Sequence, residues 1–291
     1  MFAYYLVKAL SWLICRLPRG TADALGRGLA AALWPLVPRK RKELAKRQII
    51  ACLQVEEAEA ERIAKESTLR FGPMLMEVLR FPVIKGHIQD YVTLTGAVDE
   101  VRAQLATGRG AIFATSHSGN WELMGGAFAQ YGIPLVGVAK QQKAGGMDRF
   151  IVEYRELIGM HITYTSGVRE MYDMLAEGWV IGLIMDQDPS RRDGIVIDFF
   201  GQPTNTVTGP AAMARFKEVP IFPVQIHRGT DGHHILTIEP GVRVEKTKDK
   251  REDIRRATQL LNDRIEAHVR QYPEEWFWLH DRWKSMREED E

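Results

Sequence analysis

Apolar and polar positions divide the chain into a helical N-terminal part and a longer part in which strands and helices alternate. From Tyr91 onward, short runs of apolar and β-branched residues are separated by stretches with helical spacing. The predicted strands cover residues 91–95, 111–115, 134–139, 161–165, 180–185, 195–199, 221–227 and 234–239. The predicted helices cover residues 98–106, 121–130, 147–158, 168–177, 210–217 and 254–271. This alternation indicates an α/β fold with a mostly parallel mixed sheet flanked by helices. The last predicted strands are close together in the sequence, so part of the sheet can be antiparallel.

The first 37 residues contain two apolar runs, Phe2–Leu17 and Ala22–Val37, which charged residues or proline interrupt. Each run is shorter than the roughly 20 residues that cross a bilayer comfortably, and neither has the basic start and small-x-small end of a signal peptide. One interpretation is a pair of ordinary core helices. The interpretation we favour is a membrane-associating segment, with the basic stretch Pro38–Arg47 facing anionic lipid. We therefore divide the chain into membrane-associating helices at residues 1–37 and one domain at residues 38–291.

A second helical stretch, Leu44–Pro82, carries a Met-containing apolar stripe. The stripe includes Phe71, Met74, Leu75, Val78 and Leu79. Stripes of this kind at helical spacing are usually core, so we predict that these side chains are buried.

Composition and charge exclude several classes of protein. With 45% hydrophobic residues in 291, the chain can bury a sizeable core, and its formal net charge of +1 argues against binding nucleic acid by neutralising phosphates. The two cysteines are Cys15 and Cys52, and no Cys or His spacing suits zinc. We therefore expect no disulfide framework, no metal and no cofactor, and a reducing compartment fits this cysteine usage.

The candidate catalytic residues follow the predicted strand at residues 111–115. Ser116–Asn120 breaks the apolar pattern with turn and helix-capping residues, and a helix is predicted from Trp121. This places His117 in the loop between a strand and a helix. Glu122 lies five positions later, so on one straight helix the two side chains would point about 140° apart. They meet only if the chain turns between them.

Spacing alone is weak support for a catalytic pair. About one histidine followed five positions later by an acid is expected by chance in a chain with 8 His and 38 acidic residues, and there are two. The second, His234 and Glu239, lies in a predicted strand, where an odd offset points side chains to opposite faces, and we discard it. The alternative for His117 is a loop histidine that hydrogen-bonds a nearby backbone carbonyl.

Four blocks of sequence, in order, resemble one known family. HSGNWE at residues 117–122 resembles the HX4(D/E) motif of the lysophospholipid acyltransferase superfamily, and its Asn-Trp-Glu ending is similar to the bacterial lipid A biosynthesis branch, the late lauroyl and myristoyl transferases. MDQD at residues 185–188, FFGQPTNTVTGPAAMA at 199–214 and WFWLHDRWK at 276–284 resemble later blocks of that branch. The resemblance covers roughly residues 98–284.

The resemblance implies an O-acyltransferase of the lipid A biosynthesis type, with residues 38–291 as the acyltransferase domain. Such an enzyme moves a fatty acyl chain from acyl carrier protein, or from coenzyme A, to a hydroxyl of a lipid A precursor. It would serve lipopolysaccharide biosynthesis at the cytoplasmic face of the bacterial inner membrane, with the carrier protein, the glycolipid and the membrane surface as partners. The alternatives are a glycolipid of the phosphatidylinositol mannoside type, a lysophospholipid, a thioesterase reaction, or a non-catalytic lipid-binding protein.

The chemistry of acyl transfer suits the roles that the resemblance gives to His117 and Glu122. A hydroxyl must lose its proton as it attacks a thioester, and imidazole is the side chain best matched to that task near neutral pH. We predict His117 as the general base, with Glu122 orienting the ring and stabilising the imidazolium. Backbone N–H groups at the start of the following helix, and the Asn120 amide, are the predicted donors to the oxyanion. Ser116 and Ser118 lie in no G-x-S-x-G elbow, which argues against a serine hydrolase.

The remaining predicted site residues are charged or amide side chains at two places. Asp186 and Gln187 follow an apolar strand, and ligands of parallel sheets gather at the carboxyl ends of strands. Asp148, Arg149 and Arg155 lie on one predicted helix, where Asp148 and Arg155 stand in positions that the family tends to fill with these residue types. Arginine suits phosphate, so we predict that these residues bind substrate. The alternatives are a strand-terminating turn for the first place and a solvated helix face for the second.

Overall fold

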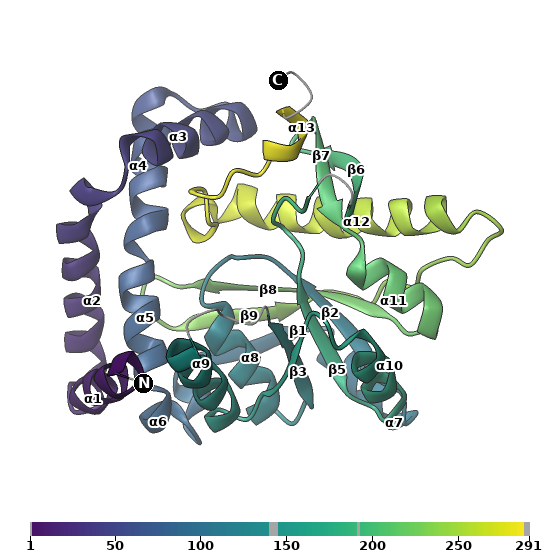
Figure 1. Cartoon of the computed structure of the whole chain (residues 1–291), viewed down its shortest axis with the longest axis horizontal. Helices are drawn as coiled ribbons and strands as arrows, with labels where there is room; N and C mark the ends of the chain where they lie inside the picture. The colour runs from purple at the N-terminus through teal and green to yellow at the C-terminus, as the bar shows by residue number, and fades with distance from the viewer. Residues whose placement is uncertain (1, 140–144, 191–192, 288–291) are drawn as a thin grey trace.

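The centre of the molecule is a seven-stranded sheet in the order β1-β9-β8-β2-β5-β3-β4. The structure is a computed structural model that describes residues 2–139, 145–190 and 193–287 (Figure 1). The strands of the sheet are β1 (Val92–Gly96), β2 (Ala111–Thr115), β3 (Leu135–Ala139), β4 (His161–Tyr164), β5 (Val180–Ile184), β8 (Ile221–Arg228) and β9 (His234–Ile238). Neighbouring strands are parallel except β8 and β9, which are antiparallel. The predicted α/β fold with a mostly parallel mixed sheet is confirmed, including its antiparallel part.

A separate antiparallel hairpin departs from the prediction. β6 (Gly194–Phe199), predicted as a strand of the sheet, instead pairs with β7 (Gln202–Val207), which was not predicted. The sequence of β7, QPTNTV, is polar and lacks the apolar alternation by which a strand is recognised. The turn between them places both Phe200 and Gly201 at positive φ, as a type I′ two-residue hairpin turn requires. The hairpin packs on α12 (Lys250–Gln271), whose Glu266 accepts a hydrogen bond from the Phe200 backbone N–H at 2.6 Å.

Helices cover both faces of the sheet, so the central strand β2 is buried on both sides. Phe113 packs into one apolar cluster, against Phe128 of α8, and its neighbour Ile112 packs into the other, which includes Leu261 of α12. The surrounding helices are α7 (Val98–Ala106), α8 (Trp121–Gln130), α9 (Gly145–Leu157), α10 (Val168–Ala176) and α11 (Gly209–Lys217). Three short helices, η2 (Ile88–Asp90), η3 (Pro273–Glu275) and α13 (Lys284–Arg287), accompany them. Because β2 and β5 are parallel neighbours, the loops that follow them lie together at one edge of the sheet.

The N-terminal part is helical and packs against this sandwich (Figure 1). Its elements are α1 (Phe2–Ile14), α2 (Arg19–Leu33), η1 (Trp34–Leu36), α3 (Arg39–Leu53), α4 (Glu57–Leu69), α5 (Phe71–Leu79) and α6 (Phe81–Ile84). α1 is fixed to α9 and α5 by a buried chain, in which the Tyr154 hydroxyl donates to Ser11 and the Ser11 hydroxyl donates to the Leu79 carbonyl at 2.6 Å. α2 contacts α5 closely because Gly26 and Gly72 face one another.

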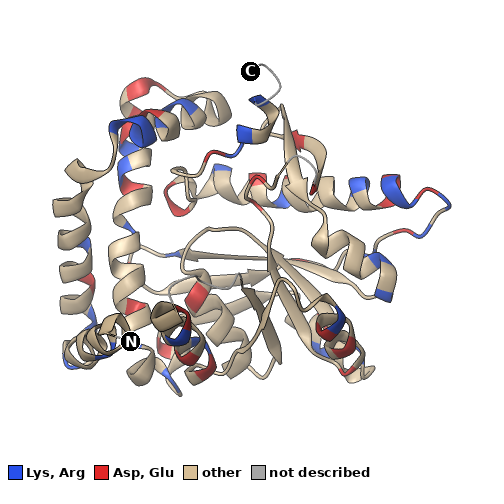
Figure 2. Cartoon of the chain, in the orientation of Figure 1, with Lys and Arg blue, Asp and Glu red and all other residues tan. Residues whose placement is uncertain are grey.

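The outward faces of α1 and α2 carry large exposed apolar side chains. These are Phe2, Tyr5, Leu6, Leu10, Trp12 and Leu13 of α1, Leu25, Leu29 and Leu33 of α2, and Leu36 of η1. α2 carries few charged residues, whereas charged residues are frequent on α3 and α4 (Figure 2). The inward faces contribute Tyr4, Ile14 and Ala22 to the same apolar cluster as the sheet. Within the described residues, no helix is both long and apolar enough to cross a membrane.

The contact between α2 and α5 makes a prediction about stability. A Cβ atom at Gly26 would lie 2.5 Å from the Gly72 carbonyl oxygen, whereas one at Gly28 would meet nothing within 4 Å. We expect Gly26→Ala to lower the free energy of unfolding by about 1–3 kcal/mol, as overpacked contacts generally do. Gly28→Ala, the matched control on the same helix, should leave stability unchanged or raise it by up to about 1 kcal/mol. Urea unfolding followed by circular dichroism measures both, and equal midpoints would contradict this account.

Candidate active site

His117 and Asp186 occupy equivalent positions after two neighbouring strands. The register of β2 and β5 pairs Thr115 with Ile184, so each site residue lies two positions beyond a paired strand end. Gly119 then turns the chain at a φ of +58°, close to the backbone of β8, before α8 begins. The predicted strand, loop and helix around His117 are confirmed.

A buried carboxylate holds the His117 ring. His117 Nδ1 lies 2.8 Å from Asp186 Oδ1, and the His117 backbone N–H donates to Asp186 Oδ2 at 2.9 Å. The indole N–H of Trp276 donates to the same Oδ2 at 2.7 Å. The Asp186 side chain is 2% exposed and the His117 side chain 22%, so the acid is sealed off while the imidazole reaches the surface. With Nδ1 engaged, Nε2 is the ring nitrogen left to exchange a proton.

Burial and ion pairing act on the protonation of this pair in opposite directions. Burial is the largest influence on His117 and disfavours the imidazolium, but the charge and hydrogen bond of Asp186 outweigh it, so the pKa of His117 is raised. Burial is also the largest influence on Asp186 and favours the neutral acid, yet His117 and the Trp276 N–H leave the pKa of Asp186 lowered. The pair is therefore an ionised carboxylate beside an imidazole that binds its proton more tightly than usual.

Glu122 does not hold the His117 ring, contrary to the prediction from the sequence. Its two carboxylate oxygens accept hydrogen bonds from the Arg155 guanidinium of α9, at 2.6 and 2.7 Å. Glu122 is the second residue of α8, and this helix directs its side chain to α9, whereas the loop directs His117 to Asp186. Glu122 still favours the imidazolium of His117 electrostatically, as a weaker influence than Asp186.

Arg70, at the junction of α4 and α5, supports the loop that carries His117. Its guanidinium donates to the Gly119 carbonyl at 2.7 Å and to the His117 carbonyl at 3.3 Å. Burial lowers the pKa of Arg70 to about 10, against the opposing influence of nearby acids that include Asp186. In the sequence Arg70 is one more charged residue of a helical stretch, and no local pattern links it to a loop 47 residues away.

Asn120 is a helix cap, which corrects its predicted place among the substrate-binding residues. Its side-chain oxygen accepts a hydrogen bond from the Leu123 N–H at 3.0 Å, and its side-chain N–H donates to Glu77 of α5 at 2.7 Å. The Asn120 residue is 2% exposed. Both ends of the amide are therefore engaged inside the protein, in the cap of α8 and in the contact with α5.

The other predicted binding residues are distributed over two places. Gln187 follows Asp186 and is partly buried. On α9, Asp148 accepts a hydrogen bond from a tyrosine of β4 at 2.9 Å, and the exposed Arg149 lies over a tyrosine ring of α1. Arg155 lies beside the His117 loop through its pair with Glu122. Asp186 and Arg155 are therefore the two that the structure brings to the loop, while Asp148 and Arg149 lie in a different hollow of α9.

An apolar groove with a volume of about 260 Å³ lies beside the site. It runs between α5 and α9 and is lined by Phe71, Met74, Leu75, Val78, Phe81, Met147, Phe150, Ile151 and Tyr154, with Glu122 and Arg155. The groove lies next to the site, because the Trp121 ring packs against both His117 and Phe71, and Phe71 lines the groove. The predicted burial of the Met-containing stripe is wrong at Leu75, which is 55% exposed, and four of the five stripe residues line the groove.

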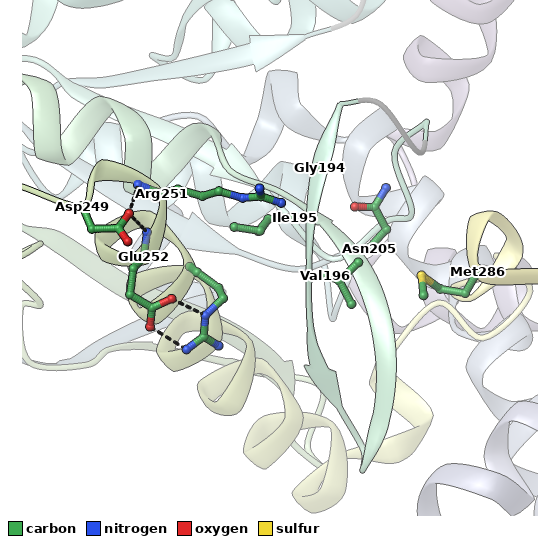
Figure 3. A pocket seen from close by; sticks show the side chains of 9 residues that line it. Gly194, Ile195, Val196, Asn205, Asp249, Arg251, Glu252 and Met286 are labelled. Carbon is green, nitrogen blue, oxygen red and sulfur yellow. Dashed lines mark hydrogen bonds and ion pairs between the residues drawn. The ribbon is translucent and has the colours of Figure 1, made fainter.

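A second pocket, of about 400 Å³, lies between the β6–β7 hairpin and the start of α12 (Figure 3). Its lining consists of Gly194, Ile195, Val196, Asn205, Asp249, Arg251, Glu252, Arg255 and Met286. The Arg255 guanidinium donates to Glu252 at 2.7 Å, and the lining contains no histidine or cysteine. Among its described lining residues this pocket offers no group that titrates near neutral pH, so we place the active site at His117.

The pairing of His117 with Asp186 makes a prediction about protonation. Because its pKa is raised, His117 becomes neutral only as the pH rises above the usual histidine value of about 6.5. Asp186→Asn removes the main charge that raises this pKa, so we expect the His117 pKa to fall. Glu122→Gln removes a weaker influence on the same group and should lower the pKa of His117 less than Asp186→Asn does. NMR titration of the histidine ring protons measures both variants, and a larger fall in Glu122→Gln would assign the pairing to Glu122.

Comparisons with known proteins identify a family. The sequence model of one family, described as bacterial lipid A biosynthesis acyltransferase, matches residues 1–285. A phosphatidylinositol mannoside acyltransferase of Mycolicibacterium smegmatis is 34% identical over 192 residues, which cover 64% of this chain and 60% of that protein. A phosphatidylinositol mannoside acyltransferase of Mycobacterium tuberculosis is 29% identical over 221 residues, 73% of this chain and 67% of that protein. A lipid A biosynthesis palmitoleoyltransferase of Escherichia coli is 23% identical over 278 residues, 94% of this chain and 88% of that protein.

The family match extends beyond the four blocks that first suggested it. It includes the N-terminal helices, which precede the first of those blocks. The aligned part spans 60% of the Mycolicibacterium relative and 88% of the Escherichia relative. The resemblance found in the sequence is confirmed, and the chain belongs to the bacterial lipid A biosynthesis acyltransferase family.

Proposed function

We propose that the protein transfers a fatty acyl chain from a thioester donor to a hydroxyl of a membrane glycolipid, with His117 as the general base. The observation that carries the proposal is a partly exposed imidazole, held by a buried carboxylate, beside an apolar groove. The acyltransferase family to which the chain belongs supports the reaction type.

In the proposed reaction, His117 Nε2 accepts the hydroxyl proton as the oxygen attacks the thioester carbonyl. The Asp186 carboxylate stabilises the imidazolium that forms. The tetrahedral intermediate then collapses, the carbon–sulfur bond breaks, and the imidazolium returns its proton to the departing thiolate. The products are an ester and a free thiol, and the step needs no nucleophile from the protein.

The surroundings of His117 supply the other groups that the proposed reaction needs, namely donors to the oxyanion and a site for the acyl chain. The backbone N–H groups of the first turn of α8, around Trp121 and Glu122, are the donors that we assign to the oxyanion, because the first turn of a helix leaves such groups without helical partners. We assign the groove to the acyl chain, since apolar walls gain about 0.8 kcal/mol for each CH₂ group that they bury. The Glu122–Arg155 pair is the polar part of that lining, and we assign it to the polar end of the donor.

Two acceptors are supported by different observations. The phosphatidylinositol mannoside acyltransferases are 34% and 29% identical to this chain, and they favour a mannose-bearing phosphoinositide as the acceptor. The family description, together with a lipid A relative that aligns with 94% of the chain, favours a lipid A precursor. We propose the mannoside first and the lipid A precursor second. Acyl carrier protein and coenzyme A are both proposed donors, because each presents the chain as a thioester.

Radiolabelled palmitoyl thioesters of both donors, each incubated with each acceptor, test the proposal. We expect labelled glycolipid with at least one pair of substrates. His117→Asn removes the base and should lower kcat by roughly 10²- to 10⁴-fold without changing the thermal unfolding curve. The matched control is His87→Asn, at a histidine whose side chain is 69% exposed.

Other outcomes of the same assay contradict the proposal. Release of free fatty acid without transfer would indicate a thioesterase, and donor binding without turnover would indicate a lipid-binding protein. A wild-type rate in His117→Asn would exclude His117 as the base.

We also propose that the protein works at the cytoplasmic face of the inner membrane, with the outward faces of α1 and α2 against the bilayer. Leu25, Leu29 and Leu33 recur every four residues, so they share one side of α2. The exposed Leu36 follows, and the basic run Arg39–Lys42 begins α3 soon after it. An apolar helix face with a cationic edge is the pattern of a helix that lies in the interface of an anionic membrane.

The double variant Leu29→Glu/Leu33→Glu tests this orientation. It removes two apolar contacts and adds negative charge, so we expect affinity for phosphatidylglycerol-containing vesicles to fall by about tenfold or more. Phe216→Glu on α11, where the phenylalanine is 65% exposed, is the matched control and should bind as the wild type does. Cosedimentation measures all three proteins, and equal loss in the control would contradict the proposed surface.

A further inference from the structure

A second buried acid–imidazole pair contacts the loop that carries His117. His234 Nε2 of β9 lies 2.9 and 3.0 Å from the two carboxylate oxygens of Glu77, which belongs to α5. Glu77 is 1% exposed and His234 is 2% exposed. Burying a charged acid and its partner is costly unless both are well hydrogen-bonded. The proposed acyl transfer assigns no role to this pair.

Glu77 reaches the loop through Asn120. The Asn120 side-chain N–H donates to Glu77 Oε2 at 2.7 Å, and the Asn120 side-chain oxygen caps α8 at the Leu123 N–H. The hydrogen bond to Glu77 therefore sets the orientation of the cap, and through the cap it sets where α8 begins. The N–H groups that we assign to the oxyanion lie in that first turn.

The loop has little freedom to absorb a shift at Asn120. At its other end the Ser116 hydroxyl donates to Gln225 of β8 at 2.9 Å. Between the two anchors, Gly119 passes so close to β8 that a Cβ atom there would lie 2.3 Å from a backbone oxygen of that strand. A displacement of Asn120 is therefore passed along the loop to His117.

The charges around Glu77 keep it ionised. Burial is the largest influence and favours the neutral acid, but His234, Arg228 and Asn120 together leave the pKa of Glu77 lowered. Arg228 lies 3.8 Å from Glu77 and pairs with Asp23 of α2. An ionised acceptor makes the hydrogen bond from Asn120 stronger than one between neutral groups.

We infer that Glu77 is a positioning residue for the acyl transfer: oriented by His234, it holds Asn120 and thereby fixes His117 and the first turn of α8. This inference rests on the proposed function, because it concerns the same base. It predicts that the loss of this anchor lowers kcat far more than it raises the KM for the donor, since the groove that we assign to the donor is lined mainly by α5, α6 and α9 and only Glu122 of its lining belongs to the first turn of α8.

Exchanging the two partners tests the inference. Asn120→Asp alone places two carboxylates in contact, one of which must bind a proton, and we expect kcat to fall by about 10²-fold with the donor KM within about twofold. Asn120→Asp combined with Glu77→Gln puts the amide on α5 and the carboxylate on the loop, where aspartate still caps α8. We expect the kcat of the double variant to be at least about tenfold higher than that of Asn120→Asp alone, because two side chains in contact are energetically coupled in a double-mutant cycle.

The NMR signal of the His117 ring is a readout that does not depend on turnover. It should shift in Asn120→Asp and return toward its wild-type position in the double variant. His234→Phe, which removes the group that orients Glu77 and leaves Asn120 in place, is a second variant and should shift the same signal. Thermal unfolding identifies the variants that are folded at the assay temperature.

Three results would overturn the inference. These are a wild-type kcat and ring signal in folded Asn120→Asp, no recovery in the double variant, and an unchanged ring signal in folded His234→Phe. Absence of transfer by the wild type would overturn the proposed function instead, and the ring signal would still test the anchor.

Discussion

One buried carboxylate joins the parts of the chain that form the site. Asp186 accepts hydrogen bonds from the His117 backbone, the His117 ring and the Trp276 indole, so the loops after β2 and β5 and the C-terminal block meet at a single side chain. A carboxylate removed from water is stable only when donors replace the lost hydration, and these three groups supply them. The geometry of the base therefore depends on β2 and β5 being parallel neighbours in register.

Much of the fold was predictable because its signals are local. The strands of the main sheet and the helices between them follow apolar periods that can be read over five to fifteen residues. β7 was missed because its side chains are polar and its order comes from pairing with β6 and from packing on α12. The stripe on α5 was predicted as core because periodicity identifies an apolar face without identifying what covers it, and part of that face lines a groove.

The candidate site was predictable in part. His117 was found from a strand-to-helix pattern and a family resemblance, but its partner was assigned to Glu122, the acid nearest in sequence. Strand order decides the true neighbour, and sequence spacing does not reveal that β5 lies beside β2. Glu77 and Arg70 precede the loop residues that they hold by 43 and 49 positions, so no local motif connects them.

The glycine contact between α2 and α5 has a mechanical consequence. Gly26 and Gly72 bring two backbones together with no layer of flexible side chains between them, so the helices have little room to slide or tilt independently. α5 also forms one wall of the groove. The exposed leucines of α2 and the α5 wall of the groove therefore belong to one rigid unit. A surface that binds those leucines consequently fixes its own distance from the groove.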